Sequence, residues 1–234
     1  MTRDRTRAPR NHQARDTFKP ERRRAGSRAA SSQPGTPSVP ENPTLNPCDD
    51  PRIAPHCERV RALVTPKRWA HILRVAQTAD AIAEGNAFAD DARHAARLAA
   101  ILHDAARDMS DAELLRLTPA RSDAEAHHPL SIHGRAARIL AERWGVTDAR
   151  VLRAIEGHTY GVPLGEPVGM AVYVADVSEP GRGVNDDIRE LAKHDLQAAY
   201  KRAVESKVNY LRAHGKHVHP TTLEVHHQIA AEPS

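Results

Sequence analysis

Residues 98–108 read LAAILHDAARD, an apolar run that ends in an adjacent histidine and aspartate, His103 and Asp104. The run predicts a buried helix, in which charged groups are costly unless they are paired or bind a metal. Imidazole and carboxylate together suit a divalent transition ion. The alternative is a helix end at which the aspartate meets solvent and the histidine caps carbonyl groups. The dipeptide alone does not decide between these two interpretations.

The first fifty residues of the 234-residue chain differ in composition from the rest. They hold ten lysines and arginines against six acids, so the whole formal net charge of +4 lies in them, together with seven of the 17 prolines. We interpret residues 1–50 as a disordered tail, because they cannot bury enough apolar surface to offset their ordering entropy. Such a tail could contact nucleic acid or an acidic partner. We favour a solvated tail with no specific role.

Hydropathy and cysteine usage restrict the class of protein. No apolar run approaches the roughly eighteen residues of a membrane span, and no signal peptide is evident. Cys48 and Cys57 are the only cysteines and lack CxxC spacing. A disulfide framework is therefore not indicated, and we expect a cytoplasmic protein.

Residues 51–234 are predicted to form a single all-α domain, a helical bundle. Strand-like alternation does not persist anywhere, whereas helical spacing of apolar residues recurs throughout. Local signals place the helix starts, among them Thr65 before Pro66, the capping box from Ser110 to Glu113, and Thr147 as an N-cap. Residues 118–127 are predicted to be a polar loop. The predicted helices cover about residues 56–64, 66–84, 90–104, 110–117, 129–145, 148–157, 168–177, 186–193, 195–214 and 220 onward.

Six residues of metal-ligand type lie near the ends of these predicted helices: His71, His103, Asp104, His133, His158 and Asp176. Taken singly, each has an ordinary alternative. His71 and His133 could be partly exposed, and His158 could interact with the dipole at the end of its helix. Asp176 could belong to an ion pair, but it is the hardest to explain. The six residues before it are all apolar, and a carboxylate on a buried helix requires a cation.

The order of these residues resembles the metal-binding pattern of the HD-domain phosphohydrolases. The surrounding motifs are similar to those of one branch, the YqeK-type symmetrical bis(5′-nucleosyl)-tetraphosphatases. The resemblance covers about residues 65–223, and HTYG followed by ADVSEPGR is its most specific part. Its motifs are KRWAH at 67–71, LHDAAR at 102–107, His133 at the start of a helix, HTYG at 158–161, VADVSEPGR at 174–182 and HVHPTT at 217–222.

The resemblance implies a site for two divalent ions, iron first, with manganese or another transition metal as alternatives. One ion would be held by His71, His103, Asp104 and Asp176, and the other by His133 and His158. Asp104 would bridge them, because a carboxylate has two oxygens. A pair of ions can share a hydroxide and clamp a phosphate. The implied reaction is hydrolysis of diadenosine tetraphosphate (Ap4A) to two ADP by a metal-bound hydroxide.

The resemblance also implies which residues meet the nucleotide substrate. Arginine binds phosphate through two parallel hydrogen bonds, which suits Arg68 and Arg182. The family usually has lysine at position 107; Arg107 keeps the charge but cannot act as a general acid, because its pKa is above about 12. The resemblance implies Asp104 and Arg107 as the catalytic residues. The implied substrate contacts are Arg68, Arg107, His133, His158, Thr159, Arg182, His217, Val218, His219, Pro220, Thr221 and Thr222.

Two other functions stay open at this point. An HD-domain phosphohydrolase could act on a nucleoside monophosphate, an alarmone or a cyclic nucleotide, although the EPGR motif favours Ap4A. The chain could also be a non-catalytic metal-binding module with a tail that tethers it to RNA. The full ligand set argues against this second function, because a structural ion would not need two further histidines.

Overall fold

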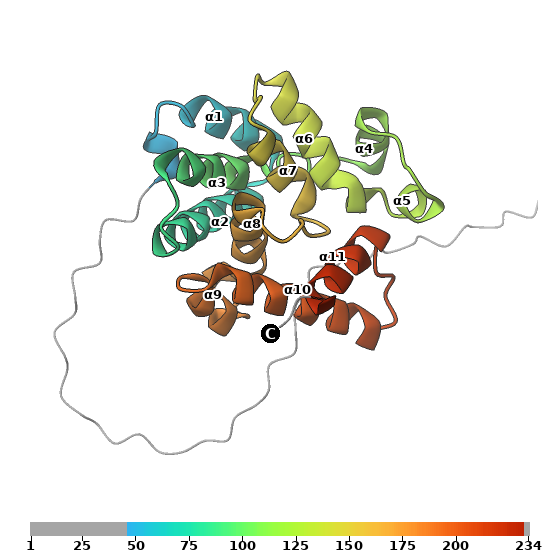
Figure 1. Ribbon diagram of the computed structural model, residues 1–234. Coiled ribbons are helices and arrows are strands. Elements are labelled where there is room, and N and C mark those ends of the chain that lie inside the picture. The colour runs from blue at the N-terminus through green and yellow to red at the C-terminus, as the bar shows by residue number, and fades with distance from the viewer. Residues whose placement is uncertain (1–45, 232–234) are drawn as a thin grey trace, which may run out of the picture.

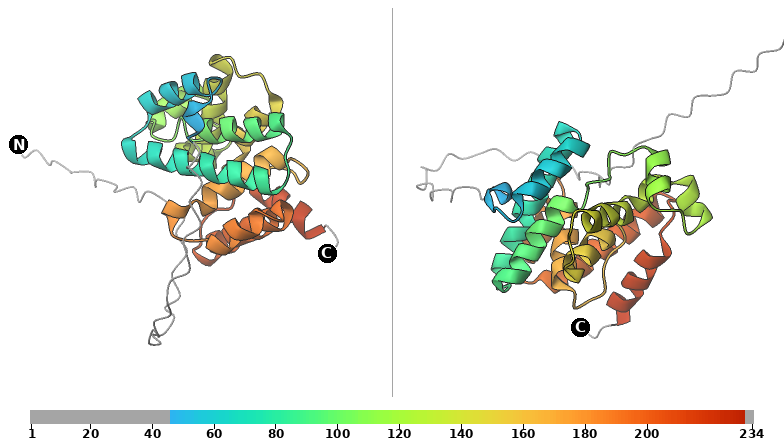
Figure 2. Two further views of the ribbon diagram at one scale, coloured as in Figure 1. Left: turned by 90° about the vertical axis from the view of Figure 1, so that its left-hand side faces the viewer. Right: turned by 90° about the horizontal axis from the view of Figure 1, so that it is seen from above.

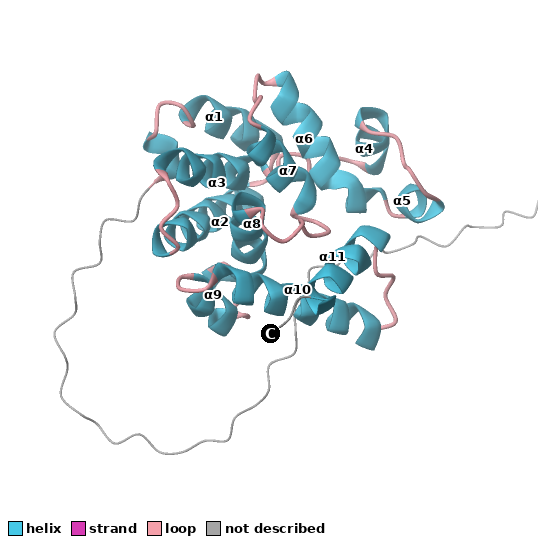
Figure 3. Ribbon diagram, in the orientation of Figure 1, coloured by secondary structure: helices cyan, strands magenta, loops and turns pink. Residues whose placement is uncertain are grey.

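The computed structural model describes residues 46–231, and these form eleven α-helices and three short 3-10 helices without any strand (Figures 1 and 3). This confirms the all-α prediction. Most of the predicted tail, residues 1–45, lies outside the described residues. The helices are η1 Pro47–Asp49, α1 Ala54–Leu63, α2 Pro66–Gly85, α3 Asp90–Leu102, α4 Asp111–Leu117, α5 Asp123–His127, η2 Pro129–Ile132, α6 His133–Arg143, α7 Ala149–Gly157, α8 Pro167–Ser178, η3 Pro180–Arg182, α9 Asp186–Ala192, α10 Leu196–Ala213 and α11 Pro220–Ala231.

Helix α8 forms the centre of the bundle. It packs against α2, α3, α7, α9 and α10, and Figure 1 shows it in the middle of the molecule. Every residue from Val168 to Ala175 is buried, as expected for a helix that is apolar on all sides. Pro167 begins the helix, where its missing N–H costs nothing. The core therefore surrounds the helix that carries Asp176.

Helices α2 and α3 have the most extensive contact of any two helices within residues 46–231, and they lie side by side in both views of Figure 2. The hydroxyl of Thr65 accepts a hydrogen bond from the backbone N–H of Arg68, which fixes the start of α2. Arg68 and His71 therefore lie on its first two turns. The apolar end of α3, from Leu98 to Leu102, is buried and leads directly into His103.

Three predicted boundaries need correction. Asp148, not Thr147, caps α7, because its carboxylate accepts the N–H of Arg150 at 2.8 Å. The predicted loop at 118–127 contains α5, which has no apolar period and was missed; Ser122 caps it. The predicted helix from Pro129 begins as the 3-10 helix η2 and becomes α-helical only at His133.

Cys48 and Cys57 form a disulfide, so the expectation of no disulfide was wrong. A turn after η1 folds the chain back onto α1 and places the two Cα atoms 6.0 Å apart, within the range that a disulfide spans. CxxC spacing was the wrong criterion, because the turn, rather than sequence proximity, brings the sulfurs together. The helix η1 also lies inside the segment predicted to be disordered. Cysteine usage no longer supports a cytoplasmic location.

Within residues 46–231, no helix combines the length and hydrophobicity that crossing a membrane requires.

Candidate metal centre

The six side chains predicted to bind metal come together where five helices meet. His71 lies on α2, His103 and Asp104 follow α3, His133 begins α6, His158 follows α7 and Asp176 lies near the end of α8. All are buried except Asp176, which is partly exposed. Their ligand atoms form three overlapping groups in which all atoms lie within 4.8 Å of one another: His71, His103 and Asp104; His103, His158 and Asp176; Asp104, His133 and His158.

Asp104 lies between two pairs of histidines. Its Oδ2 atom is 3.7 Å from Nε2 of His71 and 3.6 Å from Nε2 of His103. Its Oδ1 atom is 3.2 Å from Nε2 of His133 and 3.5 Å from Nε2 of His158. Ligands bound about 2.0–2.2 Å from one ion lie at such separations from each other. Each oxygen could therefore serve a different ion.

Asp176 faces the first of these histidine pairs. Its Oδ1 atom lies 3.1 Å from Nε2 of His71 and 3.9 Å from Nε2 of His103. Both histidines predicted to share an ion with Asp104 and Asp176 thus lie within 4 Å of each carboxylate. Burial opposes ionisation of Asp104 and Asp176, but nearby histidines, and Arg182 in the case of Asp176, hold both pKa values well below their usual range. Both groups are carboxylates at neutral pH.

The histidines are oriented for coordination through Nε2. The Nδ1 atoms of His103, His133 and His158 lie 2.6–2.7 Å from backbone carbonyl oxygens. Since a carbonyl can only accept, each Nδ1 carries the proton and each Nε2 presents a lone pair to the centre. The Nε2 atoms of His133 and His158 even face each other at 2.9 Å. Two lone pairs cannot bond to each other, whereas a cation would satisfy both.

The electrostatics of the histidines also suit a metal. Burial lowers the pKa values of His103 and His133 to about 4, so both are neutral at neutral pH. The Nε2 atoms of His71 and His103 are buried, and no atom of residues 46–231 forms a hydrogen bond with them. Burial opposes protonation of His71, but Asp176 and Glu179 outweigh it and raise its pKa. A metal ion bound at Nε2 of His71 would take the place of the proton that the raised pKa favours. The residues of this centre therefore fit a divalent ion.

Three arginines predicted to meet phosphate lie at the same centre. Arg68 Nη1 is 2.8 Å from Oδ2 of Asp104, and Arg182 pairs with the carboxylate of Asp176. Burial lowers the pKa of Arg107, while Asp104 favours its charged form. Glu179, three residues before Arg182, pairs with Arg74, whose Nε lies 2.5 Å from Oε2. The centre therefore combines two carboxylates with two guanidinium groups that contact them and a third, that of Arg107, that interacts electrostatically with Asp104.

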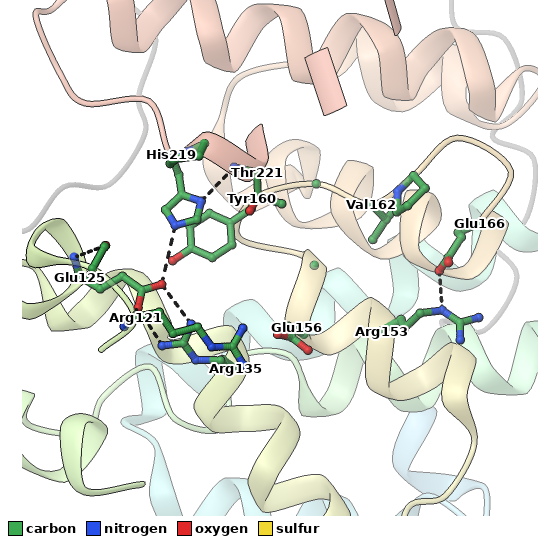
Figure 4. Close-up of a pocket in the computed structure, with 15 residues that line it drawn as sticks. Arg121, Glu125, Arg135, Arg153, Glu156, Tyr160, Val162, Glu166, His219 and Thr221 are labelled. Carbon is green, nitrogen blue, oxygen red and sulfur yellow. Dashed lines mark hydrogen bonds and ion pairs between the residues drawn. The ribbon is translucent and has the colours of Figure 1, made fainter. Parts of the chain in front are cut away.

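A pocket of about 420 Å³ lies between α5, α7 and the start of α11, and none of the six ligand candidates lines it. Figure 4 shows the ring of His219 stacked on that of Tyr160, with ring centroids 3.8 Å apart. Tyr160, which lines the pocket, follows His158 by two residues in the chain. Arg135 and Glu125 form an ion pair on one side.

Only half of the segment predicted to meet the base or ribose lines this pocket. His219, Pro220 and Thr221 do so. Val218 instead packs against the hydrophobic core, Thr222 is buried, and His217 is exposed. Thr159 lies beside His158, and its hydroxyl donates to the carbonyl of Glu156 at 3.3 Å.

Sequence reasoning missed several residues around the centre. Glu179 and Tyr160 stand inside the motifs ADVSEPGR and HTYG, but no role was assigned to them. Arg135, two residues after His133, was given no role, yet it is buried. Lys207 gives no local signal, since a lysine on a long helix is ordinarily exposed.

Comparison with known proteins agrees with this geometry. The model of the HD domain matches residues 68–196, which include all six ligand candidates. The chain belongs to the HD-domain family. This confirms the family resemblance drawn from the sequence.

Similar HD-domain proteins cover most of the chain. One from Bacillus subtilis, named bis(5′-nucleosyl)-tetraphosphatase, symmetrical, is 33% identical over 70% of this chain and 90% of its own length. Another of the same name, from Halalkalibacterium halodurans, is 30% identical over 74% of this chain and 94% of its own. A crystal structure from Clostridium acetobutylicum, described as a predicted HD superfamily hydrolase involved in NAD metabolism, matches with a TM-score of 0.69 and 26% identity. That match covers 76% of this chain and 96% of the other.

Proposed function

We propose that this HD-domain phosphohydrolase is a symmetrical bis(5′-nucleosyl)-tetraphosphatase that hydrolyses Ap4A to two ADP. The observation that carries the proposal is the position of Asp104, whose two oxygens face two separate histidine pairs while Arg68 contacts one of those oxygens. The names of the relatives from Bacillus subtilis and Halalkalibacterium halodurans support the choice of substrate.

In this proposal the chain holds two divalent ions, with iron as the first candidate and manganese or another transition metal as alternatives. His71, His103, Asp104 and Asp176 hold one, and Asp104, His133 and His158 hold the other. When bound, the ions would activate a water molecule and neutralise charge on the phosphates. The imidazoles and carboxylates act as ligands and form no bond to phosphorus.

The arginines position and neutralise the polyphosphate chain. Charge spreads over the phosphoryl oxygens in the transition state, so fixed cations aimed at those oxygens lower the barrier. Arg68, Arg107 and Arg182 surround the carboxylates and could each turn to a phosphate oxygen when ions occupy the centre. Arg107 is always charged and cannot give a proton to the departing ADP, so another group or water supplies it.

The pocket beside the centre is suited to a nucleoside. The stacked rings of Tyr160 and His219 offer an aromatic surface to a base, and the carboxylate of Glu125 lies 3.6 Å from Nε2 of His219. Thr159 stands between His158 and the pocket residue Tyr160 in the chain. We therefore assign one adenosine of Ap4A to this pocket.

Product analysis tests the proposal. Full-length protein, loaded anaerobically with Fe²⁺ or separately with Mn²⁺, is given Ap4A, and the nucleotides are separated by ion-pair chromatography. ADP as the sole product supports symmetric cleavage. ATP with AMP would contradict it. A parallel panel of a nucleoside monophosphate, an alarmone and a cyclic nucleotide compares kcat/KM values, and a higher value for any of them would replace Ap4A as the substrate.

A further inference from the structure

Lys207 of α10 lies against both halves of the candidate centre. Its Nζ donates to the carbonyl oxygen of Thr159 at 2.5 Å, and Thr159 directly follows His158. The same Nζ lies 5.3 Å from the centroid of the Tyr173 ring. Tyr173 stands one helical turn before Asp176 on α8. A residue on a third element thus reaches the segments that carry one ligand candidate of each ion.

The ammonium group of Lys207 has N–H donors that form no hydrogen bond or ion pair within residues 46–231. Within residues 46–231, no carboxylate forms an ion pair with it, whereas Arg68 and Arg182 each pair with a carboxylate of the centre. The charged groups that act on Lys207 are Asp176, which favours its charged form, and Arg182, which opposes it. An ammonium has three N–H donors, and the carbonyl of Thr159 takes one. Burial lowers its pKa to about 8, so Lys207 is mainly charged at neutral pH.

We propose that Lys207 is a phosphate-binding residue of this centre, whose free N–H groups hold oxygens of the polyphosphate chain. The residue as a whole is partly exposed. Asp176 and Arg182 both act electrostatically on its ammonium group, so Lys207 lies close to two residues that the proposed function places at the ions and the polyphosphate. This inference rests on the proposed function, and it adds a cation from α10 that the HD motifs do not contain.

The ordinary alternative is a structural cap. Lysine near the end of a helix can satisfy free carbonyl groups, and Thr159 lies just beyond α7. A cap would stabilise the turn that holds His158 and would not change affinity for phosphate. The two roles therefore affect different measurable quantities.

Lys207→Met separates these roles, because it keeps the apolar stem and removes the charge. Isothermal titration gives the Kd of inorganic pyrophosphate for the full-length, metal-loaded protein, and steady-state kinetics give KM and kcat for Ap4A. Loss of a charge-assisted hydrogen bond predicts that Kd and KM rise by about ten- to a hundredfold. Metal content and Tm should match the wild type, and Lys207→Arg should restore part of the affinity. Lys193→Met, at an exposed lysine paired with Glu190, is the control for a lost charge.

Three results would overturn the inference. The first is an unchanged Kd for pyrophosphate in Lys207→Met, with or without a lower Tm. The second is an equal loss in the Lys193→Met control, which would indicate a general charge effect. The third is no pyrophosphate binding by the wild type. Failure of the wild type to hydrolyse Ap4A would contradict the proposed function alone, because pyrophosphate binding would still report on Lys207.

Discussion

The Nδ1 atom of His71 lies 3.0 Å from the Oε1 atom of Glu179, whereas the other three histidines of the centre direct Nδ1 to backbone carbonyls. Glu179 is only 2% exposed and is held by Arg74 and by the backbone N–H of Gly181. Burial opposes its ionisation, but His71 and Arg74 lower its pKa to about 2. His71 is therefore the one histidine of the four that is oriented by a full negative charge.

Glu179→Gln is expected to weaken metal binding. The amide keeps the size of the side chain but removes the charge that makes His71 a stronger base, and loss of such a partner costs about 10–100-fold in metal affinity. Titration of metal into the protein measures the change. Glu84→Gln, at an exposed carboxylate on the same helix as His71, should leave the affinity unchanged. Equal metal affinities in wild type and Glu179→Gln would show that the contact between His71 and Glu179 does not affect metal binding.

Arg107→Met is expected to keep the metal and lose rate. Arg107 follows Asp104 by three residues, and in the proposed function its guanidinium neutralises phosphate charge and does not bind metal. Removal of one such group should lower kcat for Ap4A by about 10²–10³-fold. Elemental analysis of the variant should show the same metal content as the wild type. Arg61→Met, at an exposed arginine of α1, serves as the control. Lost metal in Arg107→Met would assign this residue a structural role instead.

Gly161→Ala is expected to destabilise the turn of the HTYG motif. Gly161 has φ +106°, and a Cβ atom there would lie 2.9 Å from the hydroxyl oxygen of Tyr200. That hydroxyl donates to the carbonyl of Val162 and accepts its N–H, both at 2.7 Å, so it cannot withdraw freely. We expect a loss of about 3 kcal/mol in the free energy of unfolding by urea.

Gly165→Ala is the matched control for this variant. Gly165 has a similar φ of +88°, but nothing lies within 4 Å of a Cβ atom placed there. Backbone strain alone should cost about 1 kcal/mol. If the two variants lose equal stability, crowding against Tyr200 is not the reason for glycine at position 161.

The ion pair between Glu125 and Arg135 should make stability depend on pH. Both side chains are buried, and their two contacts measure 2.8 and 3.0 Å. Arg135 lowers the pKa of Glu125 below its ordinary value of 4.5, although burial opposes this. Because the folded-state pKa is the lower one, the stabilisation is complete above pH 4.5 and is lost as the pH falls through the folded-state value.

Glu125→Gln tests this dependence. Breaking a buried pair from one side leaves Arg135 without its partner charge and should cost about 3 kcal/mol at pH 7. The free energies of unfolding of wild type and variant should converge as the pH falls below 4.5. A difference that stays constant between pH 7 and the acid range would contradict the assignment of that stability to the carboxylate.

Much of the centre could be predicted from the sequence because its ligands lie beside local signals. Thr65 and Pro66 fix the start of α2, and with it the position of His71. The apolar run before His103 and the uninterrupted apolar face of α8 indicate burial directly. The six ligand candidates lie near the ends of predicted helices, and the packing of those helices brings them together, as expected for a small helical bundle.

The remaining features depend on tertiary contacts that no local pattern reports. Helix α5 has only five residues and no apolar stripe; Glu125 ties it to Arg135 on α6. The disulfide depends on a turn that reverses the chain after η1. Lys207 reaches Thr159 across 48 positions of sequence. Each of these contacts needs the folded bundle before its partner can be named.

The most direct test of the account is the number of metal ions bound by the wild type and by Asp104→Asn. Asp104 presents one oxygen to each histidine pair, so in the proposed centre its two oxygens link two ions. Elemental analysis after equilibrium dialysis should find two equivalents in the wild type and fewer than one in Asp104→Asn, with hydrolysis of Ap4A lost. Two equivalents retained in Asp104→Asn, or one in the wild type, would contradict a centre in which Asp104 is shared by two ions.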